Sequence, residues 1–263
     1  MIPKIVHFTW FSNDPYPEKV IRCMDSWKKV LPDYEFKKWD MEAVGRIDSA
    51  FMSEALECKK WAYAADYVRL YAIYNEGGIY LDTDVEVYSS LDPFLEHRLF
   101  IGRENSQTLD AYGRTQNGLS SHCFGAEAKH PFIEDCLSYY DSHHFIVSRN
   151  ERLPQSLRWS MILIPYIQAE IARNYGYEGN VDSVYKNKKQ ECNDGICIYP
   201  STYFDALSNS KGAVCRHLAL GAWRDNYTAV DTDTIVFHIK AGILNVINGF
   251  FGIFNYKIVK KTT

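Results

Sequence analysis

Two aspartates stand two residues apart in this chain, at the end of an apolar run that begins with a glycine pair. Asp82 and Asp84 follow residues 77–81. Side chains alternate across a strand, so a regular strand would project both carboxylates from one face, near its carboxyl end. Ligands bind at that end of the strands in open α/β sheets. Divalent cations such as Mg²⁺ are usually held by one or two carboxylates together with substrate phosphates, so the pair predicts a metal and diphosphate site. The alternative is that both residues only end a strand and begin a turn.

A second charged pair lies upstream, on a segment whose apolar spacing and alanine content predict a mostly buried helix over 60–74. Asp66 and Arg69 are three residues apart and therefore share one helical face. An isolated buried charge is very costly, so these two groups must pair or bind a ligand. A structural ion pair and a pair that binds a ligand both stay open as interpretations.

The elements that must position these residues read as the first half of an α/β domain. A strand, a helix and a second strand in succession are typical of a βαβ unit. The predicted elements are a strand over 1–10, a helix over 17–32, a strand over 34–39, short helical pieces over 41–57 and the helix over 60–74. The glycines at 77 and 78 end that helix before the acidic pair.

The later part of the chain predicts fewer and shorter elements. Strands are expected at 99–102 and 120–125, and the polar segment 103–118 between them is predicted to be a mobile loop. The remaining predictions are helices over 130–140 and 161–175 and a strand with a turn over 198–204.

Composition bounds the class of protein. The chain has 263 residues and 46% hydrophobic content, which suits one α/β domain with a helical insertion. The net charge is −4 and the cations are scattered, so the chain lacks the basic stripe of nucleic-acid binders, and nucleic acid is not an expected partner. Aromatic residues make up 15% and can supply stacking planes for sugars or bases.

Cysteine usage and the amino terminus indicate a cytoplasmic protein. The seven cysteines are odd in number and show neither CxxC nor zinc-type spacing, so we expect reduced thiols, with a Cys192–Cys197 pair as the alternative. The apolar run at residues 1–10 is too short for a signal peptide and reads as a strand, so export is not indicated.

The carboxyl-terminal residues differ in character from the rest, and we divide the chain into a domain over 1–235 and a tail over 236–263. In the tail, apolar residues alternate with glycine and asparagine before Lys257, Lys260 and Lys261. The apolar stretch is too interrupted for a membrane-spanning helix, which needs about twenty apolar residues. It is either a terminal helix packed on the domain or a basic amphipathic segment that contacts the inner face of a membrane.

Taken together, the segment 2–10, the Asp66/Arg69 helix, the 77–84 run and the segment 217–223 resemble a known family. It is the group of DXD-containing sugar transferases that includes the yeast initiating mannosyltransferase, bacterial capsular-polysaccharide enzymes and the catalytic domains of the large glucosylating toxins. The matching motifs span residues 1 to about 90 and recur near 198–204 and 217–223, in the same order and spacing. The resemblance implies a GT-A fold, a Rossmann-like nucleotide-diphospho-sugar transferase domain, and transfer of a sugar from a nucleotide-sugar with retention of configuration.

The resemblance also implies roles for the charged residues. Asp84 matches the aspartate that binds the metal directly, and Asp82 matches the one that contacts ribose and, directly or through water, the metal. Asp66 and Arg69 match a pair that holds the donor hexose and its phosphates. His217 looks like the distal residue that completes the metal shell, although a lone histidine is more often an ordinary structural residue. Imidazole suits a manganese-like ion better than calcium, so the expected cofactor is Mn²⁺ or Mg²⁺.

Four further positions match family residues around the nucleotide-sugar donor. Trp10 matches an aromatic residue that stacks near the base, Tyr80 lines the nucleotide pocket, Trp223 lies downstream of the metal histidine, and Asp40, at the end of the second strand, is a weaker candidate for the nucleoside. Relatives often have Ser-Trp where this chain has Ala222-Trp223, and a Gly-Pro element is altered at 163–165, so the acceptor side departs from the family pattern.

The predicted function is a metal-dependent glycosyltransferase. It would move a hexose, uridine-linked by the toxin-like and capsule-like resemblance, to a glycan or lipid-linked oligosaccharide in surface or capsular polysaccharide synthesis. The bound cation and Arg69 would neutralise charge on the departing diphosphate. We assign no base, because the leaving phosphate itself can take the acceptor's proton. Arg103, Glu104 and Asn117 are loop candidates for contacts with sugar.

Two other classes stay open. A phosphatase of the haloacid-dehalogenase type also places Asp-x-Asp after an apolar strand and uses the first aspartate as nucleophile, but on its first strand, whereas here two predicted strands precede the motif. A non-catalytic nucleotide-sugar binder with the same fold is the second alternative.

Overall fold

The computed structural model describes residues 1–110, 113–207, 209 and 211–220. Residues Met1–His217 form one compact unit, and Leu218–Thr263 form a second. The predicted tail over 236–263 and Trp223 lie outside the described residues, so the division into 1–235 and 236–263 stays a prediction. Among the described residues, no helix combines the length and the apolar character that crossing a bilayer requires.

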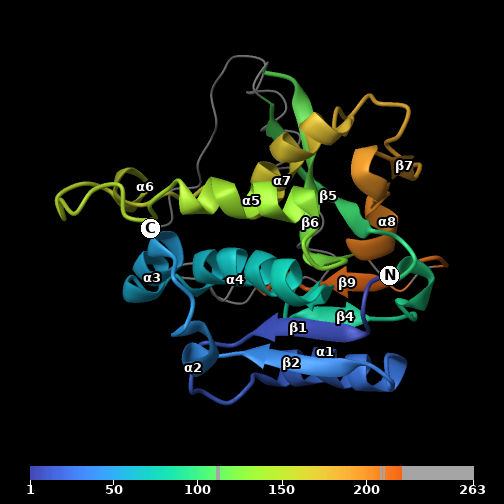
Figure 1. Ribbon diagram of the computed structural model, residues 1–263, viewed down its shortest axis with the longest axis horizontal. Helices are drawn as coiled ribbons and strands as arrows, with labels where there is room; N and C mark the ends of the chain where they lie inside the picture. Colours follow the sequence, from blue (N-terminus) through green and yellow to red (C-terminus); the bar gives the residue numbers. More distant parts are fainter. Residues whose placement is uncertain (111–112, 208, 210, 221–263) are drawn as a thin grey trace, which may run out of the picture. The chain divides into compact units, whose positions relative to one another are not determined.

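A seven-stranded mixed sheet runs through the first unit, in the order β2-β1-β3-β6-β5-β8-β7 (Figure 1). Strand β1 is parallel to β2 and β3, β6 runs antiparallel to both β3 and β5, and β5 is parallel to β8. The strands are β1 Ile5–Thr9, β2 Glu35–Trp39, β3 Gly78–Leu81, β5 Leu99–Leu109, β6 Thr115–Ala126, β7 Gln190–Glu191 and β8 Ile196–Tyr199. The predicted α/β class is confirmed.

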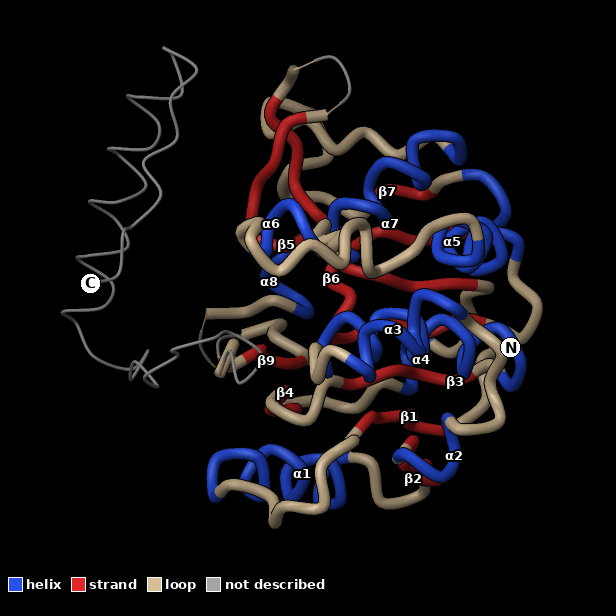
Figure 2. Tube along the Cα trace, turned by 90° about the vertical axis from the view of Figure 1, so that its left-hand side faces the viewer, coloured by secondary structure: helices blue, strands red, loops and turns tan. Residues whose placement is uncertain are grey.

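A separate two-stranded ribbon joins β4 Val85–Val87 to β9 Cys215–His217, and the two strands lie side by side in Figures 1 and 2. The helices surround the sheet. They are α1 Glu18–Val30, α2 Met41–Val44, α3 Ala50–Glu57, α4 Trp61–Glu76, α5 Pro131–Asp141, α6 Gln155–Arg158, α7 Ile164–Ala172 and α8 Ser201–Phe204, with 3₁₀ turns at Asp92–Phe94, Arg173–Tyr175 and Asn193–Gly195.

Two apolar cores cover opposite faces of the sheet, as the alternation on β3 shows. Ile79 and Leu81 belong to the core that includes Trp27 of α1, whereas Tyr80 belongs to the core that includes α3, α4, α5 and α7. Because successive strand residues face opposite sides, this pattern places Tyr80 and helix α4 on the same face. Helix α4 is therefore held directly over the end of the strand that precedes the acidic pair.

The glycine pair after α4 is required by backbone geometry. Gly77 and Gly78 have φ of 69° and 106°, where residues with a Cβ are strained. A Cβ on Gly78 would come within 2.6 Å of the Ile5 carbonyl oxygen. These two glycines end the helix and let β3 approach β1 closely, as predicted.

Three sequence predictions for later elements were wrong in detail. Most of 103–118 is not a loop, because β5 extends to Leu109 and pairs with β6 through contacts such as Gln107 with Asn117. Backbone pairing holds this hairpin although its side chains are polar, so no apolar alternation marked it. The helix expected from 161 begins only at Ile164, with a proline in its first turn. The strand and turn expected over 198–204 are a strand that begins earlier, at Ile196, and ends at Tyr199, and the short helix α8 in place of the turn.

All seven cysteines are free, so the predicted reduced thiols are confirmed and the Cys192–Cys197 alternative is wrong. These two residues sit near the turn of the β7–β8 hairpin, in which Glu191 pairs with Cys197. Cys192 is one position further along, and neighbouring positions on a strand project to opposite faces.

A buried histidine connects the first two strands to the glycine pair. His7 is fully buried, its Nδ1 accepts a hydrogen bond from Trp39 Nε1 at 3.1 Å, and its Nε2 lies 2.9 Å from the Gly77 carbonyl oxygen. The indole N–H can only donate and the carbonyl can only accept, so the imidazole is neutral with its proton on Nε2. Burial lowers the pKa of His7 below its usual 6.5, an effect that outweighs the Gly77 hydrogen bond.

We expect this histidine to destabilise the fold in acid. The unfolded chain gains a proton below pH 6.5 while folded His7 resists it, so its contribution is complete above pH 6.5 and is lost as pH falls toward the lowered folded pKa. The unfolding free energy is measured by urea titration at about pH 7.5 and about pH 5. Between these two values it should fall less for His7→Gln than for the wild type. An equal loss in both proteins would contradict this.

Candidate active site

The acidic pair lies in a turn and not on a strand. β3 ends at Leu81, and the Val85 N–H donates to the Asp82 carbonyl oxygen at 3.0 Å, closing a turn that leads into β4. The expectation of a regular strand at Asp82 and Asp84 was therefore wrong. The turn releases the two carboxylates from the alternation of the strand, so their direction depends on the turn and on what packs beside it.

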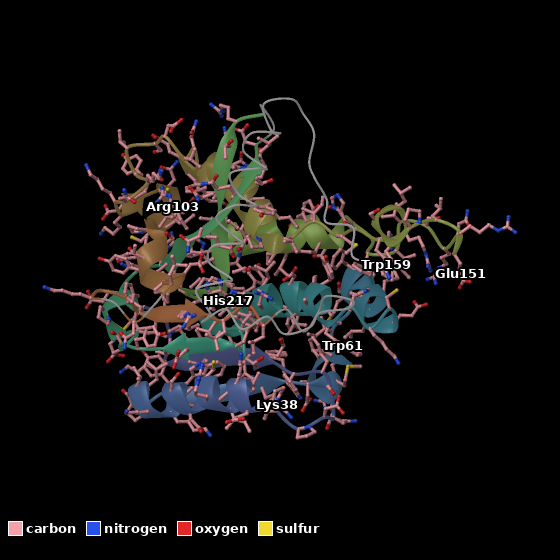
Figure 3. All side chains as sticks on the ribbon, turned by 180° about the vertical axis from the view of Figure 1, so that it is seen from behind. Lys38, Trp61, Arg103, Glu151, Trp159 and His217 are labelled. Carbon is pink, nitrogen blue, oxygen red and sulfur yellow. The ribbon has the colours of Figure 1, made fainter. Side chains whose placement is uncertain are left out.

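His217 approaches this turn from the far end of the described chain. It lies on β9 (Figure 3), where it pairs with Val85 of β4, the residue that follows Asp84. His217 Nε2 is 3.3 Å from Asp84 Oδ1. One ligand atom from each of Asp82, Asp84 and His217 lies within 4.8 Å of the others. In the described part of the chain this is the one group of three or more acidic, histidine or cysteine side chains arranged to hold a metal ion.

The chemistry of this donor set fits the expected cofactor. Carboxylate oxygens suit Mg²⁺ and Mn²⁺, and a single imidazole nitrogen favours the transition metal of the two. Burial opposes a charge on the His217 imidazole, but the neighbouring Asp84 carboxylate outweighs it and raises the His217 pKa. The same proximity of negative charge would attract a cation to this place.

Arg69 joins the α4 helix to the acidic turn. Its Nη2 lies 3.0 Å from Asp66 Oδ1 and 3.4 Å from Asp82 Oδ1, and its Nη1 donates to the Ser121 carbonyl oxygen at 2.8 Å. Asp66 and Arg69 are 5% and 4% exposed. The structural ion pair of the helix is therefore present and is in contact with the acidic turn, while a contact of this pair with a ligand stays a prediction.

Asp66 has an unusual environment for a carboxyl group. Burial raises its pKa to about 7, with the charge of Asp82 adding to the effect and Arg69 and a hydrogen bond from the Ile164 backbone N–H opposing it. Burial likewise opposes a charge on Arg69, but Asp82 and Asp66 outweigh it and raise the Arg69 pKa, so the guanidinium stays charged.

Tyr80 contacts the acidic turn from the buried side. Its side chain is fully buried, its hydroxyl donates to Asp82 Oδ1 at 3.1 Å and lies 3.0 Å from Thr9 Oγ1, and the Arg69 guanidinium lies 4.6 Å from its ring centroid. Burial raises the pKa of Tyr80, so the hydroxyl stays protonated and can donate. The structure places the Tyr80 hydroxyl against Asp82, and the contact with a nucleotide that the resemblance implies stays a prediction.

Trp10 and Asp40 lie at the same edge of the sheet, because they follow the carboxyl ends of the parallel strands β1 and β2. The Trp10 ring packs against Tyr16 with centroids 4.7 Å apart, and its Nε1 donates to the Asp14 carbonyl oxygen. Asp40 caps α2 by accepting a hydrogen bond from Ala43 N at 3.1 Å and pairs with Lys38. Its carboxylate thus has a local structural role, and a role with the nucleoside is still a prediction.

The sequence did not reveal that His122 lies at this site. His122 is 1% exposed on β6, and its ring stacks on His217 with centroids 4.4 Å apart. Its Nε2 lies 2.9 Å from the Phe204 carbonyl oxygen and its Nδ1 lies 3.6 Å from Glu104 Oε1. Burial opposes protonation, but Glu104 and Asp205 outweigh it and raise the His122 pKa to about 10. No local pattern marks this histidine, because it stands inside a buried strand.

The three candidates for sugar contacts differ in their surroundings. Glu104 faces His122, as described above. Arg103 is 2% exposed and donates to Gln190 Oε1 at 2.7 Å, so it links β5 to β7 across the intervening strand β8. Asn117 Nδ2 donates to the Glu104 carbonyl oxygen at 2.9 Å and so links the strands of the hairpin.

Comparisons with known proteins find similarity to sugar transferases. Residues 17–101, which end before most of β5, match the family described as "Glycosyltransferase sugar-binding region containing DXD motif". Inositol phosphoceramide mannosyltransferase 3 of Schizosaccharomyces pombe is 32% identical over 136 residues, which is 50% of this chain and 35% of that protein. Mannosyl phosphorylinositol ceramide synthase CSH1 of Saccharomyces cerevisiae is 28% identical over 153 residues, or 56% of this chain and 38% of that protein.

The aligned region thus spans little more than a third of the curated relatives. Among solved structures, one named PaToxG Glycosyltransferase is similar with a TM-score of 0.43 and 19% identity, covering 66% of this chain and 69% of that one. The predicted resemblance to DXD-containing sugar transferases is confirmed, and the relatives that the chain matches are named as mannosyl-transferring proteins. The match is to transferases, and the acidic pair follows the third strand, so neither observation favours a phosphatase.

Replacement of His217 tests the metal shell. We expect His217→Gln to raise the Mn²⁺ concentration needed for half-maximal activity at least about tenfold, because one of three ligand groups is lost. The melting temperature should change little, since β9 pairs through its backbone. His143→Gln, at an exposed histidine after α5, is the matched control. An unchanged Mn²⁺ titration for His217→Gln would remove this residue from the shell.

Proposed function

We propose that this chain is a metal-dependent glycosyltransferase that moves a hexose from a nucleotide-sugar to a hydroxyl group of a glycolipid or glycan, with retention of configuration. One observation supports it most: an acidic turn, a distant histidine and a buried arginine converge on one place at the carboxyl ends of the parallel strands. Each is suited to the diphosphate of such a donor.

Some residues of this site would supply charge to the reaction, and others hold those residues in position. A divalent cation held by Asp82, Asp84 and His217 would act as a Lewis acid on the diphosphate. Arg69 would neutralise the charge that develops on the departing phosphate, while Asp66 fixes the direction of the guanidinium from the same helix. Tyr80 holds Asp82 in place from the buried side. We assign no protein base, because the leaving phosphate can accept the proton of the attacking hydroxyl.

The names of the relatives favour one substrate class over the other. Both are named for transfer of mannose to a phosphoinositol-bearing ceramide, whereas the sequence alone suggested a uridine-linked sugar and a capsular polysaccharide. We therefore propose a mannosyl donor and an anionic glycolipid acceptor. The expected cytoplasmic location, on the inner face of a membrane, is part of this proposal and is supported by the free cysteines.

A donor screen tests the proposed function without an acceptor. Purified protein is incubated with Mn²⁺ and uridine- and guanosine-linked sugars in ¹⁸O-labelled water, and free nucleoside diphosphate is measured. We expect slow, metal-dependent hydrolysis of one donor with the label in the sugar. Label in released phosphate would indicate a phosphatase. Absence of hydrolysis for every donor would indicate a non-catalytic binding protein.

A further inference from the structure

Exposed apolar side chains are concentrated in one loop of the described chain. The segment 143–163, between α5 and α7, is called the α5–α7 loop here. It contains four of the ten exposed large apolar side chains among the described residues. They are Val147, Leu157, Met161 and Ile162, with exposures of 67%, 58%, 38% and 54%. Such a concentration marks an interaction surface, because exposed apolar residues are otherwise scattered singly.

The charge of this loop differs in sign from that of the whole protein. It carries three arginines, Arg149, Arg152 and Arg158, and one acidic residue, Glu151, in a chain whose net charge is −4. Arg149 pairs with Glu57 only at an exposed position. The Nε of Arg158 is buried without a hydrogen-bond partner among the described residues. The loop thus offers apolar and cationic groups together.

The base of the loop is held firmly. Phe145 is fully buried and stacks on Trp159, with ring centroids 6.0 Å apart, and the Ser160 N–H donates to the Phe145 carbonyl oxygen at 2.8 Å. Lys60 Nζ lies 4.7 Å from a ring centroid of Trp159. Figure 3 shows Glu151 at the outer end of the loop. The structure therefore presents the exposed residues on a fixed support.

The α5–α7 loop is also connected to the candidate active site, through α7 and through the start of α4. It leads directly into α7, whose first residue, Ile164, donates its backbone N–H to Asp66. The contact between Lys60 and Trp159 joins it to the start of α4, the helix that carries Asp66 and Arg69. A surface bound by this loop would therefore lie close to the donor site.

We propose that the α5–α7 loop docks the protein on an anionic lipid bilayer, with its apolar side chains at the boundary between head groups and acyl chains. This inference rests on the proposed function, because an acceptor that is a membrane lipid has to be reached at the membrane surface. Apolar residues flanked by arginine suit such a surface, where anionic head groups attract cations. Two copies of this loop in a symmetric interface would instead bring like charges together.

The test compares vesicle binding of matched variants of the full chain. The loop variant carries Leu157→Ser, Met161→Ser and Ile162→Ser. The control variant carries Val184→Ser and Leu207→Ser, at exposed apolar positions outside the loop, each 72% exposed. Co-sedimentation uses phosphatidylcholine vesicles with and without roughly 30% phosphatidylserine. We expect the wild type and the control to bind only the anionic vesicles and the loop variant to bind about tenfold less.

Several results would overturn this proposal. The first is wild-type binding that is absent, or that is equal on neutral and anionic vesicles. The second is a loop variant that binds like the wild type, which would assign binding to another part of the chain such as 236–263. The third is a wild-type dimer that the loop substitutions separate into monomers. Donor hydrolysis in solution should be equal in all three proteins. It is measured without lipid, so its absence in the wild type would refute the proposed function and not the vesicle result.

Discussion

Replacement of Asp84 with asparagine is expected to abolish metal-dependent turnover and leave the fold intact. The side chain keeps its shape but loses the charge that, with Asp82 and His217, would hold the cation. We expect donor hydrolysis with Mn²⁺ to fall by about 10³-fold or more, which corresponds to about 4 kcal/mol of lost transition-state stabilisation. Hydrolysis rates at saturating Mn²⁺, together with the melting temperature, measure the two effects separately.

Glu86→Gln is the matched control for that variant. Glu86 lies on β4, two residues after Asp84, and accepts a hydrogen bond from the Tyr88 hydroxyl at 3.1 Å. Its replacement removes the same charge from the same strand region without touching the metal ligands, so its rate should stay within a few-fold of the wild type. Activity of Asp84→Asn in that range would contradict the site.

Replacement of Arg69 with methionine should have the largest effect on stability. Asp66 and Asp82 both lie within 3.4 Å of the guanidinium, and Asp66 is almost fully buried. Removal of the cation leaves both carboxylates without a neutralising charge, which typically costs about 3–5 kcal/mol of unfolding free energy. Urea titration at neutral pH measures it. Methionine keeps much of the volume, so a cavity contributes little to the loss.

A double variant shows whether unneutralised charge causes the loss of stability in Arg69→Met. Asp66→Asn in the Arg69→Met background removes one of the two orphaned carboxylates, so we expect it to recover part of the lost stability, whereas Asp66→Asn alone should destabilise the wild type. This non-additivity is what a direct pair produces. Additive losses would show that the two side chains do not interact, and a loss below about 1 kcal/mol for Arg69→Met would contradict the buried pair.

Much of the amino-terminal half could be predicted from the sequence. The helix expected over 60–74 is α4, Trp61–Glu76, and the strand over 34–39 is β2, Glu35–Trp39. The glycine pair ends α4 as expected. These features depend on local periodicity and on backbone conformations open mainly to glycine, and both can be read in a short window of sequence. The polar hairpin of β5 and β6 could not, because backbone hydrogen bonds and polar side-chain contacts hold its strands together and leave no apolar alternation in the sequence.

The sequence by itself determined which chemical groups this protein has: an acidic pair after a buried strand, and an aspartate and arginine on one face of a buried helix. Only the tertiary structure decided where those groups point. The acidic pair turns out of the strand, β4 pairs with β9 to bring His217 to Asp84, and His122 stacks behind it. Pairing between strands far apart in the chain depends on the whole packed fold, so no local pattern of residues can specify it.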